Sequence, residues 1–192
     1  MGVEVDREKP FYFTKSAQML QPSGTSIPYP PGTSNFHFEM ELVIAIGKPA
    51  FKLGVNNALD AVYGYACGLD MTRRDLQLAE RAKQRPWDLG KDVEQSAVIS
   101  TITKAVELLV RLVCNASRCR SMARRSRMRN FPDLIWKVEE IISHLSGFYH
   151  LAAGDYSCAT GTPAGVGRLW RRPDRGTIDG LDPISLAIGP AE

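Results

Sequence analysis

A strand with two glutamates on one face constrains this chain more than any other feature. Residues 36–47 read Phe-His-Phe-Glu-Met-Glu-Leu-Val-Ile-Ala-Ile-Gly, an apolar run with the alternation of a β-strand. Because successive side chains of a strand point to opposite faces, Glu39 and Glu41 share a face with His37, and apolar side chains take the other face. The pattern predicts a half-buried strand that carries paired carboxylates.

Paired carboxylates need compensation. They repel each other, so one takes up a proton unless a cation or several donors lie beside them. Asp70 follows a second apolar run, residues 61–69, which we expect to be a strand that ends at Asp70. Three carboxylates without a thiolate suit a hard ion such as Mg²⁺, Mn²⁺ or Ca²⁺. The alternative is a solvated Glu-x-Glu pair on an edge strand, and these residues alone leave both interpretations open.

Composition predicts one globular domain over residues 1–192, because 44% of the chain is hydrophobic. No apolar run approaches the length of a membrane span, and residues 1–10 are too polar for a signal peptide or anchor. The four cysteines show no Cys-x-x-Cys spacing. We therefore expect free thiols and a cytoplasmic setting.

The remaining pattern favours a β-rich α+β fold. Helices are expected over residues 56–62, 75–84 and 133–148, and a strand over 156–160 leads into a glycine-rich turn at 161–167. Short strands outnumber helices and do not alternate regularly with them, so a doubly wound sheet is disfavoured.

Several motifs together resemble the fumarylacetoacetate hydrolase family, and they occur in that family's order. They are His-x-Glu-x-Glu-Leu at 37–42, Gly-Leu-Asp-Met-Thr-Arg-Arg-Asp-Leu-Gln at 68–77, Gly-Lys at 90–91 and Thr-Gly-Thr-Pro-Ala-Gly-Val-Gly at 160–167. The resemblance covers roughly residues 9–103 and 131–167, and it resumes at 176–181. It is closest to the small bacterial members that hydrolyse fumarylpyruvate in gentisate breakdown.

This resemblance implies a mixed β-sandwich roll, a homodimer, and Mg²⁺ or Mn²⁺ bound by Glu39, Glu41 and Asp70. It also implies metal-dependent hydrolysis of the carbon–carbon bond of an acylpyruvate, with 3-fumarylpyruvate giving fumarate and pyruvate. A 2-oxo acid can chelate such an ion, which then stabilises the enolate that leaves. Family relatives isomerise or decarboxylate related 2-oxo acids on the same metal, and the three carboxylates do not distinguish these reactions.

The resemblance further gives roles to polar residues. Arg74 is expected to pair with a substrate carboxylate, Gln77 to orient water or a substrate oxygen, and Lys91 to stabilise the developing oxyanion. Thr162 and the amide of Gly161 are expected to hold the far carboxylate.

Simpler interpretations exist for some of these residues. In isolation Lys91 would be a surface lysine, Arg73 a solvated helix residue, and Asp75 a cap of its own helix. His37 either supports the metal ligands or acts in catalysis.

Two departures from the family pattern concern the N-terminal part of the chain. Family members usually carry a His and a Glu on a lid helix ahead of the position that matches Met1, and these serve as the base. If Met1 is the true start, we expect the base to be missing or to be supplied otherwise, with His37 or a metal-bound water as candidates. Ser16 stands where the family usually has a proline.

A third departure from the family pattern is the concentration of positive charge in two arginine-rich segments. Net charge is +3, yet residues 111–129 hold seven arginines and no acid, and residues 168–175 hold four arginines and one aspartate. Together these segments carry +10, which leaves the rest of the chain at −7. Because family pattern is lost over 108–129 and 168–175 and then recovers, we hypothesise local reading-frame shifts in the reported gene. An intact frame on resequencing would refute this hypothesis.

The competing interpretation of the arginines is a basic surface that binds nucleic acid. Such binding would weaken steeply with salt, and filter binding at rising salt tests it. The arginines are not interleaved with aromatic residues and no nucleic-acid motif is present. The composition therefore favours the enzyme over a nucleic-acid-binding protein.

Overall fold

The computed structural model describes residues 8–109, 136–159, 167–168 and 174–191. The strands are β1 (Leu20–Pro22), β2 (Ser26–Tyr29), β3 (Phe36–Ile46), β4 (Val62–Arg73), β5 (Ala97–Ile99), β6 (Thr103–Lys104), β7 (Tyr156–Ala159), β8 (Gly167–Arg168), β9 (Asp174–Gly176) and β10 (Ile184–Ala191). The helices with both ends in the described residues are η1 (Ala17–Met19), α1 (Val55–Ala58), η2 (Leu59–Ala61), α2 (Arg74–Ala82), α3 (Asp88–Lys91) and α5 (Val138–Ser146), and residues 105–109 are also helical. The β-rich α+β class expected from the sequence is confirmed.

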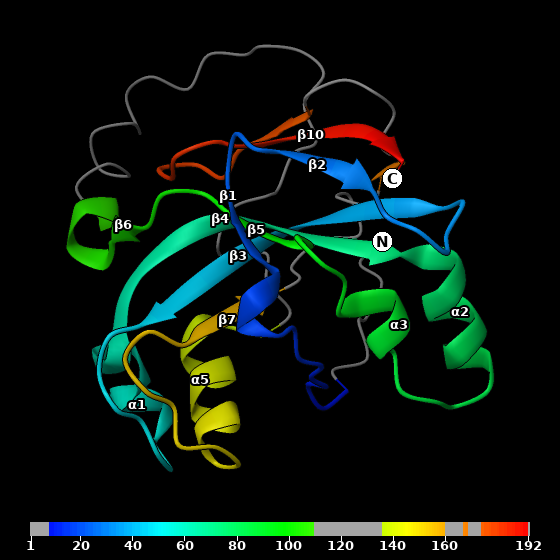
Figure 1. Cartoon of the computed structure of the whole chain (residues 1–192). Helices are drawn as coiled ribbons and strands as arrows, with labels where there is room; N and C mark the ends of the chain where they lie inside the picture. Colours follow the sequence, from blue (N-terminus) through cyan, green and yellow to red (C-terminus); the bar gives the residue numbers. More distant parts are fainter. Residues whose placement is uncertain (1–7, 110–135, 160–166, 169–173, 192) are drawn as a thin grey trace, which may run out of the picture.

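Two sheets organise these elements. The larger has the order β1-β5-β4-β3-β7, with β6 also paired to β4 and β8 to β3, and the smaller has the order β2-β10-β9. In Figure 1, β2 and β10 lie above the long strands β3 and β4, α1 and α5 lie below them, and α2 and α3 lie to the right. The long antiparallel pair β3–β4 is therefore the centre of the fold.

The alternation of β3 and β4 separates a core face from a polar face. Met40 and Leu42 of β3 and Leu69 and Met71 of β4 belong to one buried hydrophobic cluster, which also takes residues from β2, β10 and α5. Residues at the intervening positions face the other way, and these include the three acidic residues. The expected core face of residues 36–47 is present, but the strand is not half-buried, because Glu41, Val43 and Ala45 on the other face are also buried.

One strand boundary was predicted incorrectly. The strand expected to end at Asp70 continues to Arg73. Its alternation persists past Asp70, because Met71 is buried in the core cluster and Thr72 is buried on the opposite face. Asp70 consequently lies within a paired strand and not in a loop.

The helix predictions are correct in place and shifted in their bounds. The expected helix over 56–62 is α1 followed by η2, and α2 ends at Ala82 because Gln84 has a positive φ of 54°. Within the described residues, α5 begins only at Val138, where Glu140 Oε2 accepts a hydrogen bond from the Lys137 amide at 2.8 Å. Gly147 is its C-cap, as its position suggested.

Several expectations fall on residues outside the described ranges. These are most of the arginine-rich segments and the glycine-rich turn with Gly161 and Thr162. The single domain over 1–192 and the frame shifts over 108–129 and 168–175 therefore stay predictions.

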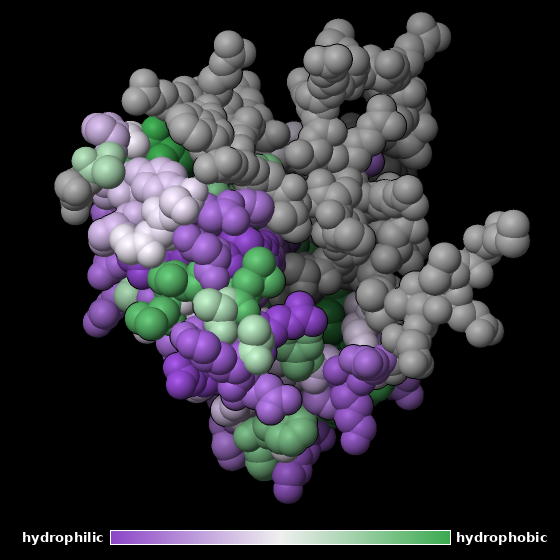
Figure 2. All heavy atoms as spheres, turned by 90° about the vertical axis from the view of Figure 1, so that its right-hand side faces the viewer, coloured by the Kyte–Doolittle hydropathy of each residue, from purple (hydrophilic) through white to green (hydrophobic). Residues whose placement is uncertain are grey.

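The helices and one face of the molecule have the following polarity. In the described part of the chain, the helices are too short or too polar to cross a membrane. Figure 2 shows the face at the right of Figure 1, where hydrophobic side chains form small clusters separated by hydrophilic ones.

Gly90 allows α3 to pack closely on α2. A Cβ atom at Gly90 would lie 2.8 Å from the backbone nitrogen of Gln77 and 2.9 Å from its Cα. We predict that Gly90→Ala lowers the free energy of unfolding by about 1–3 kcal/mol, because backbone atoms cannot yield as a flexible side chain can. Urea denaturation measures this.

Gly54→Ala is the matched control, because a Cβ there meets no atom within 4 Å and φ is −69°. Equal losses of stability in the two variants would contradict close packing at Gly90.

Cys67 lies in the core, and burial raises the pKa of its thiol to about 11. A rise of two units from the ordinary value of 9.0 reduces the thiolate about 100-fold. We predict that iodoacetamide at pH 8 labels Cys67 at least about 100-fold more slowly in the native protein than in the urea-unfolded protein. Peptide mapping by mass spectrometry measures both rates, and equal rates would mean that Cys67 is exposed.

Candidate functional site

Strand pairing brings the three acidic residues together. Glu39 of β3 lies directly opposite Asp70 of β4, and Glu41 lies opposite Gly68, which adds no side chain on that face. One oxygen from each carboxylate can be chosen so that the three lie within 4.8 Å of one another. Two neighbouring strands thus deliver the oxygen donors that a hard divalent ion requires.

Burial makes this cluster dependent on positive charge. Glu41 and Asp70 are 3% and 4% exposed, and β3 lies between β4 and β7. Desolvation, followed by the charges of Asp70 and Glu39, raises the pKa of Glu41 well above its usual value. The interpretation of a solvated pair on an edge strand is therefore wrong.

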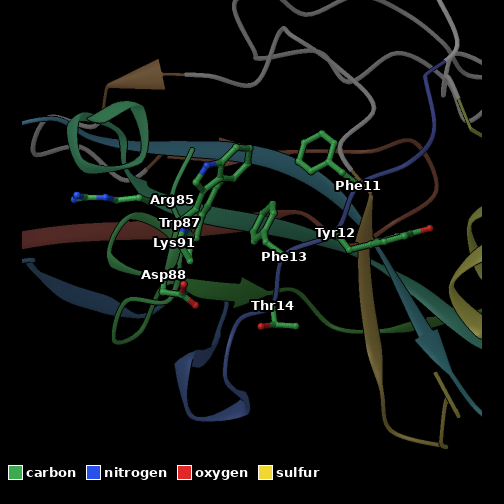
Figure 3. Close-up of a pocket in the computed structure, with 9 residues that line it drawn as sticks. Phe11, Tyr12, Phe13, Thr14, Arg85, Trp87, Asp88 and Lys91 are labelled. Atoms are coloured by element: carbon green, nitrogen blue, oxygen red, sulfur yellow. The ribbon is translucent and has the colours of Figure 1, made fainter. Parts of the chain in front are cut away.

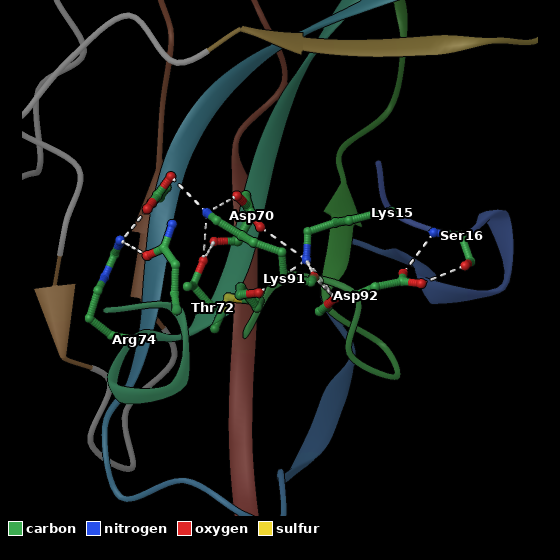
Figure 4. A network of polar contacts seen from close by, with 11 residues as sticks. Lys15, Ser16, Asp70, Thr72, Arg74, Lys91 and Asp92 are labelled. Carbon is green, nitrogen blue, oxygen red and sulfur yellow. Dashed lines mark hydrogen bonds and ion pairs between the residues drawn. The ribbon is translucent and has the colours of Figure 1, made fainter. Parts of the chain in front are cut away.

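Lys91 is one source of that charge. Its Nζ donates to Asp70 Oδ2 and to Thr72 Oγ1, the latter at 2.9 Å, and lies 3.1 Å from Glu39 Oε2. Figure 4 shows Lys91 between Arg74 on one side and Lys15 on the other. Only 1% of Lys91 is exposed, so its interpretation as a surface lysine is wrong.

Lys15 is a second source of positive charge, although no motif in the sequence indicates a role for it. Its Nζ lies 3.0 Å from Asp70 Oδ1 and donates to Ser96 Oγ at 2.7 Å and to the carbonyl oxygens of Met71, at 3.1 Å, and Lys91. These partners are 55 to 81 residues away along the chain, and no local pattern signals them. A lysine just after the aromatic run at 11–13 was the available hint.

Arg74 supplies the third cation. Its Nη2 donates to Glu39 Oε1 and its Nη1 to Gln77 Oε1. Burial alone would raise the pKa of Glu39, but Lys91 and Arg74 together bring it below its usual value. The buried Nε of Arg74 has no hydrogen-bond partner among the described residues.

Of the other predicted site residues, the structure describes His37 but not Gly161 or Thr162. His37 lies on the carboxylate face, where its Nε2 is 2.7 Å from Asn35 Oδ1. Gly161 and Thr162 lie outside the described residues, so their roles stay predictions.

Asp75 and Arg73, which also had simpler interpretations, each contact a neighbouring segment of the chain. Asp75 accepts hydrogen bonds from Thr33, Ser34 and the Leu76 amide, and so joins α2 to the loop before β3. Arg73 ends β4 and bonds the Leu89 carbonyl at 3.3 Å, so it is not a solvated helix residue.

A cavity of about 400 Å³ adjoins the carboxylate cluster through Lys91. In Figure 3 the rings of Phe11, Phe13 and Trp87 gather around it, whereas Arg85 extends away. The Phe13 ring lies 4.7 Å from Lys91 Nζ, a cation–π contact. The cavity therefore combines aromatic walls with Lys91, the residue that also contacts the carboxylates.

Nearly the whole chain is similar to known proteins. Residues 2–188 match the family model described as fumarylacetoacetate (FAA) hydrolase C-terminal. The chain is 49% identical over 195 residues to a fumarylpyruvate hydrolase of a Ralstonia species, which covers all of both chains. It is 34% identical over 173 residues to a mitochondrial oxaloacetate decarboxylase of Dictyostelium discoideum, which covers 87% of this chain and 76% of that one.

Among solved structures, fumarylpyruvate hydrolase from Pseudomonas aeruginosa in complex with Mn²⁺ and pyruvate matches with a TM-score of 0.81 and 37% identity. That match covers 97% of this chain and 81% of the other. The expected fold is thus confirmed, and the chain belongs to the fumarylacetoacetate hydrolase family.

Proposed function

We propose that this protein hydrolyses the carbon–carbon bond of an acylpyruvate, with 3-fumarylpyruvate giving fumarate and pyruvate. The observation that carries the proposal is the buried cluster of three carboxylates within reach of three cationic side chains. Full-length identity of 49% to a fumarylpyruvate hydrolase supports the choice of substrate.

Glu39, Glu41 and Asp70 fit a divalent ion, since all their donors are oxygens and they lie on adjoining buried strands. Mn²⁺ and Mg²⁺ both accept such ligands, and the relative from Pseudomonas aeruginosa contains Mn²⁺. When bound, the ion supplies Lewis-acid stabilisation of negative charge on the 2-oxo acid.

Charge balance favours an anionic substrate. Three carboxylates face Lys15, Lys91 and Arg74, so the described side chains of the cluster are neutral in sum when all are ionised. A divalent ion then adds two positive charges, which a doubly charged 2-oxo acid offsets. Fumarylpyruvate, with a carboxylate at each end, meets this requirement.

The side chains have distinct tasks in this reaction. Lys91 Nζ, fixed between Asp70 and Glu39, places a positive charge beside the oxygen on which negative charge develops. Arg74 keeps a buried Nε–H that no described residue accepts, and this donor suits a substrate carboxylate. Gln77 is held by Arg74 and orients water or a substrate oxygen.

The bond changes follow from this placement. Water adds to the acyl carbonyl carbon, the bond from that carbon to the pyruvyl methylene breaks, and the electron pair passes to the pyruvate enolate. Transfer of a proton from solvent to the methylene carbon then gives pyruvate, and the carboxylic acid formed at the acyl carbon releases its proton to give fumarate. His37, oriented by Asn35, is our candidate for the base that takes the proton from water.

Isomerisation or decarboxylation of a related 2-oxo acid is the second candidate. It is favoured by the 34% identity to an oxaloacetate decarboxylase, and the same carboxylates would serve it. The larger identity to a fumarylpyruvate hydrolase places hydrolysis first.

Other parts of the functional expectation stay predictions. They are the homodimer, the cytoplasmic setting, a place in gentisate breakdown, and Mg²⁺ as an equal alternative to Mn²⁺. Sedimentation velocity tests the first, cell fractionation the second, growth of a deletion strain on gentisate the third, and activity with each metal the fourth.

We predict that the protein with Mn²⁺ hydrolyses 3-fumarylpyruvate. The absorbance of the substrate's enol form should fall, and one pyruvate should be released per molecule of substrate. Glu41→Gln should lower kcat/KM at least about 100-fold because it removes a charged metal ligand. Glu107→Gln makes the same change on an exposed residue and should leave the rate unchanged.

His37→Gln should lose turnover while still binding Mn²⁺.

Pyruvate is measured with lactate dehydrogenase alongside the absorbance. Absorbance loss without pyruvate would support isomerisation instead. No reaction in the presence of Mn²⁺ or Mg²⁺ would overturn the proposed substrate.

A further inference from the structure

We propose that Lys15 is a positioning residue that fixes the Asp70 carboxylate and the backbone at Lys91, and that its charge keeps the site from binding a divalent ion too tightly. This inference rests on the metal site of the proposed function. It concerns a residue to which the sequence motifs gave no role.

The two lysines divide the Asp70 carboxylate between them. Lys91 Nζ donates to Oδ2, and Lys15 Nζ lies 3.0 Å from Oδ1. Each carboxylate oxygen therefore faces its own ammonium group, and rotation of the carboxylate would break both contacts. Asp70 is 4% exposed, so water cannot replace a lost partner at low cost.

Lys15 is already fully engaged by the protein. Its ammonium group has three N–H donors, and four protein oxygens surround it, from Asp70, Met71, Lys91 and Ser96. No donor remains for a substrate oxygen, in contrast to Arg74 with its unpartnered Nε–H among the described residues. Lys15 therefore acts through Asp70 and Lys91 and not by touching the substrate.

The position of Lys15 joins three parts of the chain. Met71 belongs to β4, Lys91 ends α3, and Ser96 precedes β5. The next residue reinforces this contact, because the Ser16 amide donates to Asp92 Oδ1 at 2.7 Å and the Ser16 hydroxyl to Oδ2 at 2.6 Å (Figure 4). Residues 15 and 16 thus hold residues 91 and 92 from one side, and this fixes the backbone position from which the Lys91 side chain extends.

Lys15 has two effects of opposite sign on the site. Its positive charge beside a ligand oxygen opposes binding of a second cation, because Coulomb interaction over a few ångströms is strong in a buried site. Its ion pair with Asp70 and its hydrogen bond to the Lys91 carbonyl orient these two residues for the reaction. Removing Lys15 therefore strengthens metal binding and slows turnover, whereas simple loosening of the structure would weaken both.

The test compares Lys15→Met, Lys15→Arg and Lys9→Met in the full chain. Lys9 is exposed in the same N-terminal segment, so Lys9→Met is the matched control. The affinity for Mn²⁺ is measured without substrate from the electron paramagnetic resonance signal of free Mn²⁺. Values of kcat and KM for 3-fumarylpyruvate are measured at saturating Mn²⁺, and thermal unfolding reports whether each variant folds.

For Lys15→Met we expect Mn²⁺ to bind about tenfold more tightly or better, and kcat to fall about 10- to 100-fold. Lys15→Arg retains the charge but not the geometry, so its Mn²⁺ affinity should stay within about twofold of wild type while kcat falls. Lys9→Met should match wild type in both.

Weaker Mn²⁺ binding in Lys15→Met, or an unchanged kcat, would overturn the inference while the proposed function stands. If Lys15→Met does not fold, an unchanged kcat in Lys15→Arg overturns it instead. Failure of the wild-type protein to bind Mn²⁺ or to hydrolyse the substrate would overturn the proposed function itself.

Discussion

Buried negative charge on the pair β3–β4 is the constraint on which the rest of the site depends. The antiparallel register sets Glu39 opposite Asp70 and leaves Glu41 beside a glycine, with almost no access to water for Glu41 or Asp70. Carboxylates so close together and so little exposed must be protonated or paired with cations. The positions of the neighbouring basic residues follow from that requirement.

Three separate elements meet this requirement, and each thereby becomes fixed relative to the sheet. Arg74 begins α2 directly after β4, Lys91 ends α3, and Lys15 comes from the segment before η1. Gly90 lets α3 approach α2 closely enough for Lys91 to reach the carboxylates. The same ion pairs that neutralise the cluster therefore also hold the walls of the cavity beside it.

The local part of this arrangement was predictable from the sequence. The alternation in residues 36–47 predicted the shared face of Glu39 and Glu41, and apolar periodicity located α5 to within a few residues. The non-local part was not. Strand length past Asp70 depends on pairing with β3, and the partners of Lys15 lie 55 or more residues away.

Ser16 shows how a departure from a family pattern can be informative. Its amide and hydroxyl both donate to Asp92, and the proline usual at this position could make neither hydrogen bond. The sequence marked the position as unusual, but only the structure shows what the serine contacts. Family motifs likewise identified Lys91, whose burial no local composition would have suggested.

The central claim is that Glu39, Glu41 and Asp70 bind one divalent ion together. The most direct measurement is a crystal structure of the protein grown with Mn²⁺, with anomalous diffraction used to locate the metal. We predict one anomalous peak per chain on the polar face of β3–β4, in bonding contact with an oxygen of each of the three residues. A peak elsewhere, or no peak at millimolar Mn²⁺, would contradict the account.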